Sequence, residues 1–108
     1  MSMKKTSAAV FVMSRFIAMQ DGAPVSLAAL RENCGLSKSY IEQIFACLLK
    51  CGLVDSYRGP GGGYMCHPDM TVGDIVLAFV SSGYMRAAPV IAALNGIRIA
   101  DLPEGFSL

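Results

Sequence analysis

Apolar residues along the first third of the chain follow the spacing of two helices. Over residues 6–20 the apolar side chains fall mainly on one side of a helix, which predicts the first helix there. A loop is expected at residues 21–24, where aspartate, glycine and proline occur together. Ser26 then has the residue type of a helix N-cap, and the leucines behind it predict a short second helix through about Asn33.

A third helix is predicted after the tight turn of residues 35–37, which ends in a serine suited to an N-cap. Ser39 and Glu42 repeat the signal, because a serine and a glutamate at this spacing can satisfy two amides at a helix start. Gly52 is expected to end the helix. The apolar positions recur at i, i+3, i+4 and i+7, and they are Ile41, Ile44, Phe45 and Leu48.

A β-hairpin is predicted directly behind this helix. Residues 53–58 form its first short strand, and residues 64–67 return as the second strand, which Pro68 ends. The segment between them, residues 59–63, consists of four glycines and one proline, so it must turn.

The last third of the chain predicts two more helices. Thr71 and Asp74 have the spacing of a capping box, and apolar residues behind them form one helical face. Residues 86–95 predict another helix, which Gly96 is expected to end. Residues 102–108 are expected to form an irregular tail.

Together these elements predict a mainly α fold with a small β-hairpin. A helix with a polar N-terminal half, followed by a hairpin with a basic Gly-Pro tip, is the layout of a winged helix-turn-helix. We assign residues 1–82 to a winged helix-turn-helix DNA-binding domain, and residues 83–108 to a C-terminal dimerisation helix and tail.

The N-terminal half of the third helix has the polar side chains that such a fold presents to the major groove. The amide of Gln43 can pair with adenine, and Glu42 can accept a hydrogen bond from the amino group of cytosine. Serine and lysine side chains can hold phosphates. The alternative is a surface helix whose polar face is merely solvated. The candidate DNA-binding residues of this helix are Ser37, Lys38, Ser39, Tyr40, Glu42 and Gln43.

Arg58, at the tip of the hairpin, is positioned to enter a minor groove, where an A·T-rich site concentrates negative potential. The glycines let backbone amides approach phosphates, because no Cβ stands in the way. An ordinary hairpin loop is the alternative. A phosphate-binding P-loop fits poorly, because no Lys-Ser or Lys-Thr pair follows the glycines and no helix begins there. The candidate DNA-binding residues of the hairpin are Arg58, Gly59, Pro60 and Gly61.

The string GLSKSYIEQIF at residues 35–45, followed by GLV at 52–54 and RGPGGGY at 58–64, resembles the Rrf2 family of bacterial winged-helix regulators, the IscR- and NsrR-like proteins. The resemblance is dense from about Pro24 to Val80. It implies a DNA-binding transcription regulator. The family's groove-reading serine, tyrosine, glutamate and glutamine match Ser39, Tyr40, Glu42 and Gln43.

The four cysteines depart from the pattern of that family. Members that sense through an iron–sulfur cluster have three closely spaced cysteines before the dimerisation helix, and the matching residues 81–89 contain none. The resemblance therefore implies a regulator without a cluster, and we expect neither a cofactor nor a metal. Cys47 and Cys51 share a helix face and could share a metal, although ordinary half-buried thiols are the simpler interpretation. A redox switch at Cys34, Cys47, Cys51 or Cys66 is a further alternative.

Composition changes this interpretation in two ways. Hydrophobic residues make up 54% of the chain and charged residues 16%, and such surplus apolar surface predicts a partner subunit, most simply a second copy. The net charge is only +1, and residues 31–58 also sum to +1 from four basic and three acidic residues. We therefore expect few phosphate contacts and a shallow salt dependence.

We find no export signal and no membrane span, which predicts a cytoplasmic protein.

These observations favour a homodimeric transcription regulator, a repressor, that binds a palindromic operator in double-stranded DNA. The alternative is an interaction module that dimerises with another regulator or a protein partner. We do not expect an enzyme, because the single histidine, His67, follows Cys66 on a strand, and adjacent strand residues point to opposite faces. The sequence identifies no small-molecule or redox effector.

Overall fold

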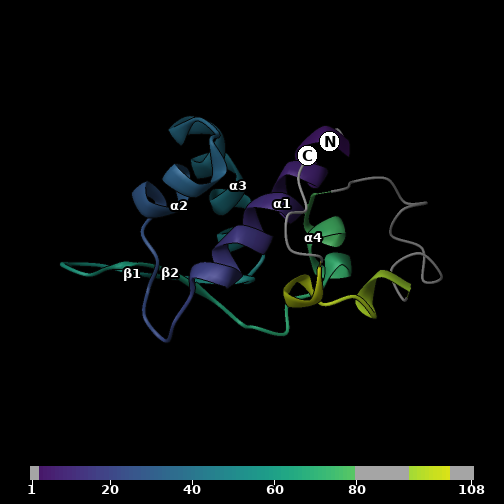
Figure 1. Ribbon diagram of the computed structural model, residues 1–108. Coiled ribbons are helices and arrows are strands. Elements are labelled where there is room, and N and C mark those ends of the chain that lie inside the picture. Colours follow the sequence, from purple (N-terminus) through teal and green to yellow (C-terminus); the bar gives the residue numbers. More distant parts are fainter. Residues whose placement is uncertain (1–2, 80–92, 103–108) are drawn as a thin grey trace.

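The computed structural model describes residues 3–79 and 93–102. Figure 1 shows the first helix in the middle of the molecule, with the second helix and the hairpin on one side and the fourth helix on the other. Each predicted element through the fourth helix is present, within three residues of its expected bounds. The elements are α1 (Met3–Met19), α2 (Leu27–Cys34), α3 (Lys38–Lys50), β1 (Val54–Tyr57), β2 (Gly63–Cys66), α4 (Val72–Phe79) and the 3-10 helix η1 (Ile99–Asp101).

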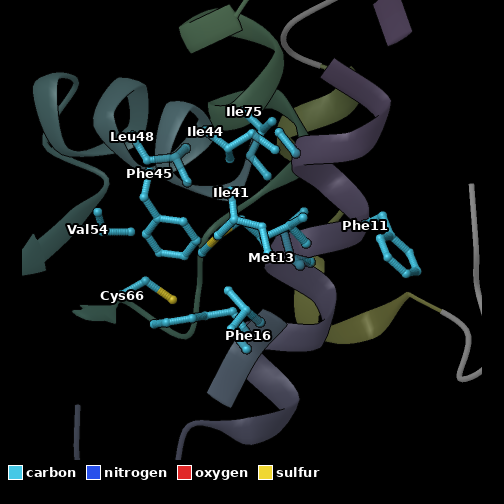
Figure 2. Close-up of a cluster of buried hydrophobic side chains, with 14 of the residues drawn as sticks. Phe11, Met13, Phe16, Ile41, Ile44, Phe45, Leu48, Val54, Cys66 and Ile75 are labelled. Carbon is cyan, nitrogen blue, oxygen red and sulfur yellow. The ribbon is translucent and has the colours of Figure 1, made fainter. Parts of the chain in front are cut away.

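Helix α1 is the centre of the hydrophobic core, because it packs against α2, α3, α4 and η1. Its residues Val12, Met13 and Phe16 are fully buried. The rings of Phe16 and Phe45 lie 5.4 Å apart between their centroids. Figure 2 shows this cluster, in which side chains of α1 meet those of α3, the hairpin and α4. Burying each large apolar side chain stabilises the fold by roughly 1.5–3 kcal/mol, so the core fixes the position of α3.

The N-terminus of α3 is capped by Ser37. Its hydroxyl oxygen accepts a hydrogen bond from the backbone N–H of Tyr40 at 3.1 Å, and its backbone is extended, with φ −67° and ψ 152°. The helix therefore begins at Lys38, and Ser39 lies inside its first turn. The second capping pair predicted at Ser39 and Glu42 is wrong, because Ser37 already provides the cap that the helix needs.

The capping box predicted for the fourth helix is confirmed. The N–H of Thr71 donates to Asp74 Oδ2 at 2.9 Å, and the N–H of Asp74 donates to Thr71 Oγ1 at 3.1 Å. These reciprocal bonds satisfy two amides that have no partner within the helix. The buried side of α4 includes Ile75, Val76 and Phe79, as the apolar pattern predicts.

The segment that follows Gly96 folds back onto this framework. Ile99 is buried, and its N–H donates to the carbonyl of Met70 at 2.8 Å. The N–H of Val72 donates to the carbonyl of Ile97 at 2.9 Å. Residues in and next to η1 thus pack against α1 and hold the loop before α4, an arrangement that the sequence analysis did not anticipate.

The predicted C-terminal helix is described only at its end. Residues 93–95 are helical, and a turn follows at Gly96, as predicted. The remainder of that helix, the predicted boundary between residues 82 and 83, and residues 103–108 lie outside the described residues. Within the described part of the chain, no helix is long and apolar enough to cross a membrane.

Candidate nucleic-acid interface

Helix α3 has one apolar face and one exposed face. Four of its residues are fully buried against the core, at the positions that the i, i+3, i+4 and i+7 spacing predicts. The exposed residues form a continuous stripe on the opposite side, because they recur at the same helical spacing. We call the exposed residues from Ser39 onward the α3 stripe, and they are Ser39, Glu42, Gln43, Ala46, Leu49 and Lys50.

The candidate DNA-binding residues of α3 differ in how they lie. Tyr40 is half-buried and packs against the core. Ser37 is exposed, and its hydroxyl oxygen accepts the Tyr40 N–H while the hydroxyl hydrogen can still be donated. Lys38 is exposed in the first turn. The structure therefore brings Ser39, Glu42 and Gln43 together as the polar part of the α3 stripe.

Lys5 lies beside this stripe, although the sequence analysis did not select it. Its Nζ donates a hydrogen bond to Gln43 Oε1 at 3.3 Å. This places a cation of α1 next to the centre of α3, in addition to the basic residues of α3 itself. Local sequence patterns cannot pair two residues that are 38 positions apart. The sequence shows only that a lysine lies near the start of the first helix.

The tip of the hairpin is a hydrogen-bonded β-turn over residues 59–62. The N–H of Gly62 donates to the carbonyl of Gly59 at 2.9 Å. Pro60 occupies the second position and Gly61, with φ 75°, the third, which are the preferences of a type II turn. Arg58 directly precedes this turn and is exposed, so it lies at the tip as the sequence predicts.

Two further glycines of the hairpin permit close approach of the backbone. A Cβ on Gly62 would meet the carbonyl oxygen of Tyr57, and a Cβ on Gly63 would meet the carbonyl of Val25. Turn geometry and packing therefore account for the whole glycine run without any bound phosphate. Arg58 is left as the residue of the RGPGGG segment whose side chain can recognise a partner.

The outer edge of β2 is paired with segments from the N-terminal half of the chain. Val25 and Tyr64 exchange two backbone hydrogen bonds of 2.9 Å each. Two residues further, the N–H of Cys66 donates to Gln20 Oε1 at 2.9 Å, and its carbonyl accepts from Gln20 Nε2 at 3.0 Å. The Tyr64 ring also lies 4.9 Å from that of Phe45. These contacts attach the hairpin to α3 and to the segment between α1 and α2.

A comparison with known protein families identifies this class of fold. The model of the Rrf2 family, described as an iron-dependent transcriptional regulator, matches residues 3–96. This chain belongs to the Rrf2 family.

The relatives of this Rrf2 chain match from about half to nearly all of it. The HTH-type transcriptional regulator IscR of Escherichia coli is 48% identical over 61 residues, which are 54% of this chain and 38% of that protein. The matched stretch thus spans less than half the length of this curated relative. The solved structure of T. potens IscR is 30% identical and covers 92% of this chain and 80% of that one, with a TM-score of 0.63. CymR, the global cysteine regulator of B. subtilis, has the same fold at 24% identity, with a TM-score of 0.68 over 99% of this chain and 98% of that one.

The Rrf2 family is described as iron-dependent, and binding iron would require suitable side chains as ligands. Metal binding requires deprotonated thiols, whereas burial raises the pKa of Cys66 to about 11 and also raises the pKa values of Cys34 and Cys47. Cys51 is exposed at the end of α3. Within residues 3–79 and 93–102, which include all four cysteines, no group of three or more Cys, His, Asp and Glu residues is placed to hold a metal. This donor set does not fit an iron site.

The neighbouring Cys66 and His67 also lie in different environments. Cys66 is buried in the core, whereas His67 is exposed and its Nδ1 accepts a hydrogen bond from the N–H of Asp69 at 3.2 Å. A thiolate–imidazole pair would need the two side chains within hydrogen-bonding distance on one face. The two side chains therefore lie apart as expected, although His67 directly follows β2 instead of belonging to it.

Proposed function

We propose that this Rrf2 protein is a DNA-binding transcription regulator that places α3 in the major groove and the hairpin in the adjacent minor groove. The observation that supports this best is the attachment of the hairpin to α3 through Tyr64 and Phe45. This contact holds the hairpin against α3, so the polar part of the α3 stripe and the exposed Arg58 keep a fixed position relative to each other. A helix and a flanking cation in fixed relation suit two neighbouring grooves of a duplex.

The proposed roles follow from residue chemistry. Ser39, Glu42 and Gln43 would face base edges, since they are exposed and polar along one line of the helix. Ser37, Lys38 and the half-buried Tyr40 would contact phosphates at the N-terminus of α3, where backbone N–H groups favour anions. Arg58 would enter the minor groove, and the backbone of Gly59, Pro60 and Gly61 would lie along its rim.

We further propose that the protein binds a palindromic operator as a homodimer and represses transcription without an iron–sulfur cluster. The support for dimerisation is exposed apolar surface on α4 and near η1. Leu77 of α4 and Ile97 are both exposed, at 39% and 43%. Light scattering at micromolar concentration tests the dimer directly, and a monomer would contradict it. The predicted contributors Val90 and Ile91 lie outside the described residues.

The experiment that tests the function is a genomic selection of DNA fragments by the purified protein, followed by footprinting. We expect one enriched motif with two-fold symmetry and protection of two major-groove segments about one helical turn apart. Recovery of unrelated fragments with no common motif would contradict the proposal.

A second candidate function is an interaction module that binds another regulator. The observation in its favour is Leu49, an apolar residue that is 41% exposed on the α3 stripe. A leucine at this position contributes little to a helix that only reads DNA. In a protein interface, the same leucine would be buried and would contribute to binding. The same purified protein distinguishes the two functions, because an interaction module would select no DNA motif.

A further inference from the structure

Lys5 and Gln43 form a contact between the first turn of α1 and the exposed centre of α3. The distance from Lys5 Nζ to Gln43 Oε1 is 3.3 Å. A lysine ammonium group has only hydrogens to donate, so it is the oxygen of the amide that must face it. The contact thereby selects one of the two orientations of the Gln43 amide and directs its NH₂ group away from Lys5.

This orientation changes what Gln43 can recognise. The bidentate pairing of glutamine with adenine needs both the amide oxygen and the amide nitrogen, one to accept from N6 and one to donate to N7. Lys5 occupies one lone pair of the amide oxygen and places a positive charge beside the other, which disfavours a base amino group there, while the NH₂ donors remain available for a base acceptor. Guanine presents two acceptors in the major groove, N7 and O6, whereas cytosine presents an amino donor.

We propose that Lys5 is a specificity-determining residue that positions the Gln43 amide as a hydrogen-bond donor, so that Gln43 selects guanine over adenine and cytosine. This inference rests on the proposed function, since it assigns a base preference to the same interface. It differs from the adenine pairing that residue type alone predicts for Gln43. Lys5 acts through Gln43 and contacts no base itself.

The test compares Lys5→Met with Lys50→Met, which removes the same charge from the far end of α3. Each full-length protein is titrated with operator duplexes that hold guanine, adenine or cytosine at the base pair nearest Gln43 in the footprint. Lys5→Met should shift the guanine-to-adenine affinity ratio toward adenine by at least about fivefold, the low end of what one good base contact contributes. Lys50→Met should weaken binding to all duplexes alike and leave this ratio unchanged.

A double-mutant cycle separates positioning from charge. In a Gln43→Ala background, Lys5→Met should no longer change the guanine-to-adenine ratio, although it should still lower affinity for every duplex. Lys5→Arg, which keeps a donor at this position, should retain the preference for guanine. An unchanged ratio in Lys5→Met, or the same change in ratio with and without Gln43, would overturn the proposal.

The contact between Lys5 and Gln43 can also be measured in the free protein, so this part of the test does not depend on knowing the operator. The side-chain amide resonances of Gln43 in the free protein should move in Lys5→Met and stay in place in Lys50→Met. No movement in Lys5→Met would overturn the proposed contact even if the protein binds DNA specifically. If the contact is present but the unsubstituted protein prefers no sequence, it is the proposed function that fails, and the base preference with it.

Discussion

Val25 and Tyr64 exchange two backbone hydrogen bonds of 2.9 Å, which join the loop before α2 to the returning strand of the hairpin. The pair gives β2 a second backbone neighbour besides β1, so its outer edge is covered at this point rather than open to solvent. Gly63 lies next to this contact and permits it, because a Cβ there would meet the carbonyl of Val25. The direction in which the hairpin projects is therefore constrained by a backbone contact that lies directly after the turn.

We predict that Gly63→Ala separates this backbone pair. The added methyl group must displace the Val25 backbone, and overpacking of this kind costs about 1–3 kcal/mol. The amides of Val25 and Tyr64 should then exchange with solvent faster than in the unsubstituted protein. Hydrogen exchange followed by NMR measures both amides, and chemical denaturation measures the loss of stability.

Gly61→Ala is the matched control for this substitution. A Cβ at Gly61 meets nothing within 4 Å, and the strain from φ +75° stays within the turn. This variant should lose about 1–2 kcal/mol through the left-handed backbone but leave the exchange of Val25 and Tyr64 unchanged. Equal exchange in both variants would show that Gly63 has no special role at the contact.

The sequence predicts the elements of this fold well, because their signals are local. The apolar spacing of α3, the reciprocal capping of Thr71 and Asp74, and the proline and glycine of the hairpin turn each lie within a few residues. The one wrong cap illustrates the limit of such rules. Two serines two positions apart, Ser37 and Ser39, both fit a cap, and only the helix start decides between them.

The contacts that arrange the elements are not local, and the sequence alone does not reveal them. Gln20 bonds to Cys66 and Lys5 bonds to Gln43 across 46 and 38 residues. Ile99 enters the core from a segment without helical or strand periodicity. For the candidate site, residue types indicate which side chains suit DNA, whereas the neighbour that orients Gln43 comes only from the packing of α1 against α3.

We predict that the four thiols react in an order set by exposure. Alkylation at neutral pH should modify the exposed Cys51 first and the buried Cys66 last, because the thiolate is the nucleophile and burial raises the pKa of Cys66 to about 11. Mass spectrometry of partly alkylated protein gives the order. Early modification of Cys66 would show that β2 opens readily from the core.

The same pKa shift predicts a loss of stability in alkaline solution. The pKa of Cys66 is higher in the folded chain than the ordinary 9.0, so the unfolded chain releases its proton first as pH rises. This contribution to stability is complete below pH 9.0 and is lost as pH rises toward about 11. Denaturation of Cys66→Ala, which has no thiol to titrate, should show a weaker decline over that range.

The ion pairs of Arg98 predict a change at the acidic end of the pH scale. Arg98 donates to both carboxylate oxygens of Asp101, at 3.0 and 3.1 Å, and to Asp69 at 3.2 Å. Hydrogen bonding to Arg98 lowers the pKa of Asp101 below the ordinary 3.8. Since this pKa is depressed in the folded chain, its contribution to stability is present above pH 3.8 and is lost as pH falls through the folded value.

Arg98→Met should therefore return the pKa of Asp101 toward 3.8, which an NMR titration of its carboxyl carbon measures. Arg31→Met removes another exposed arginine, on α2, and should leave the titration of Asp101 as it is. If Asp101 titrates at the same pH in all three proteins, the ion pair does not form in solution.

The hairpin tip and the α3 stripe should contribute to DNA binding in different ways. Arg58→Ala removes a cation from the hairpin tip, so binding should weaken most at operators with A·T-rich flanks, where a narrow minor groove attracts arginine. The dependence of affinity on salt should become shallower by roughly one phosphate equivalent. Arg58→Lys keeps the charge, so it should retain the salt dependence but lose part of the preference for A·T-rich flanks.

Gln43→Ala should lower sequence specificity and leave the salt dependence unchanged, because it removes a hydrogen-bonding amide without changing the charge. We expect it to cost about 1–3 kcal/mol on the preferred operator and much less on scrambled DNA, with an unchanged salt dependence. Titrations of the Arg58 and Gln43 variants against operator and scrambled duplexes, each at two salt concentrations, measure both effects. If neither substitution alters affinity for the operator, the α3 stripe and hairpin tip do not form the DNA interface. The exposed Leu49 would then indicate a protein partner for the same surface.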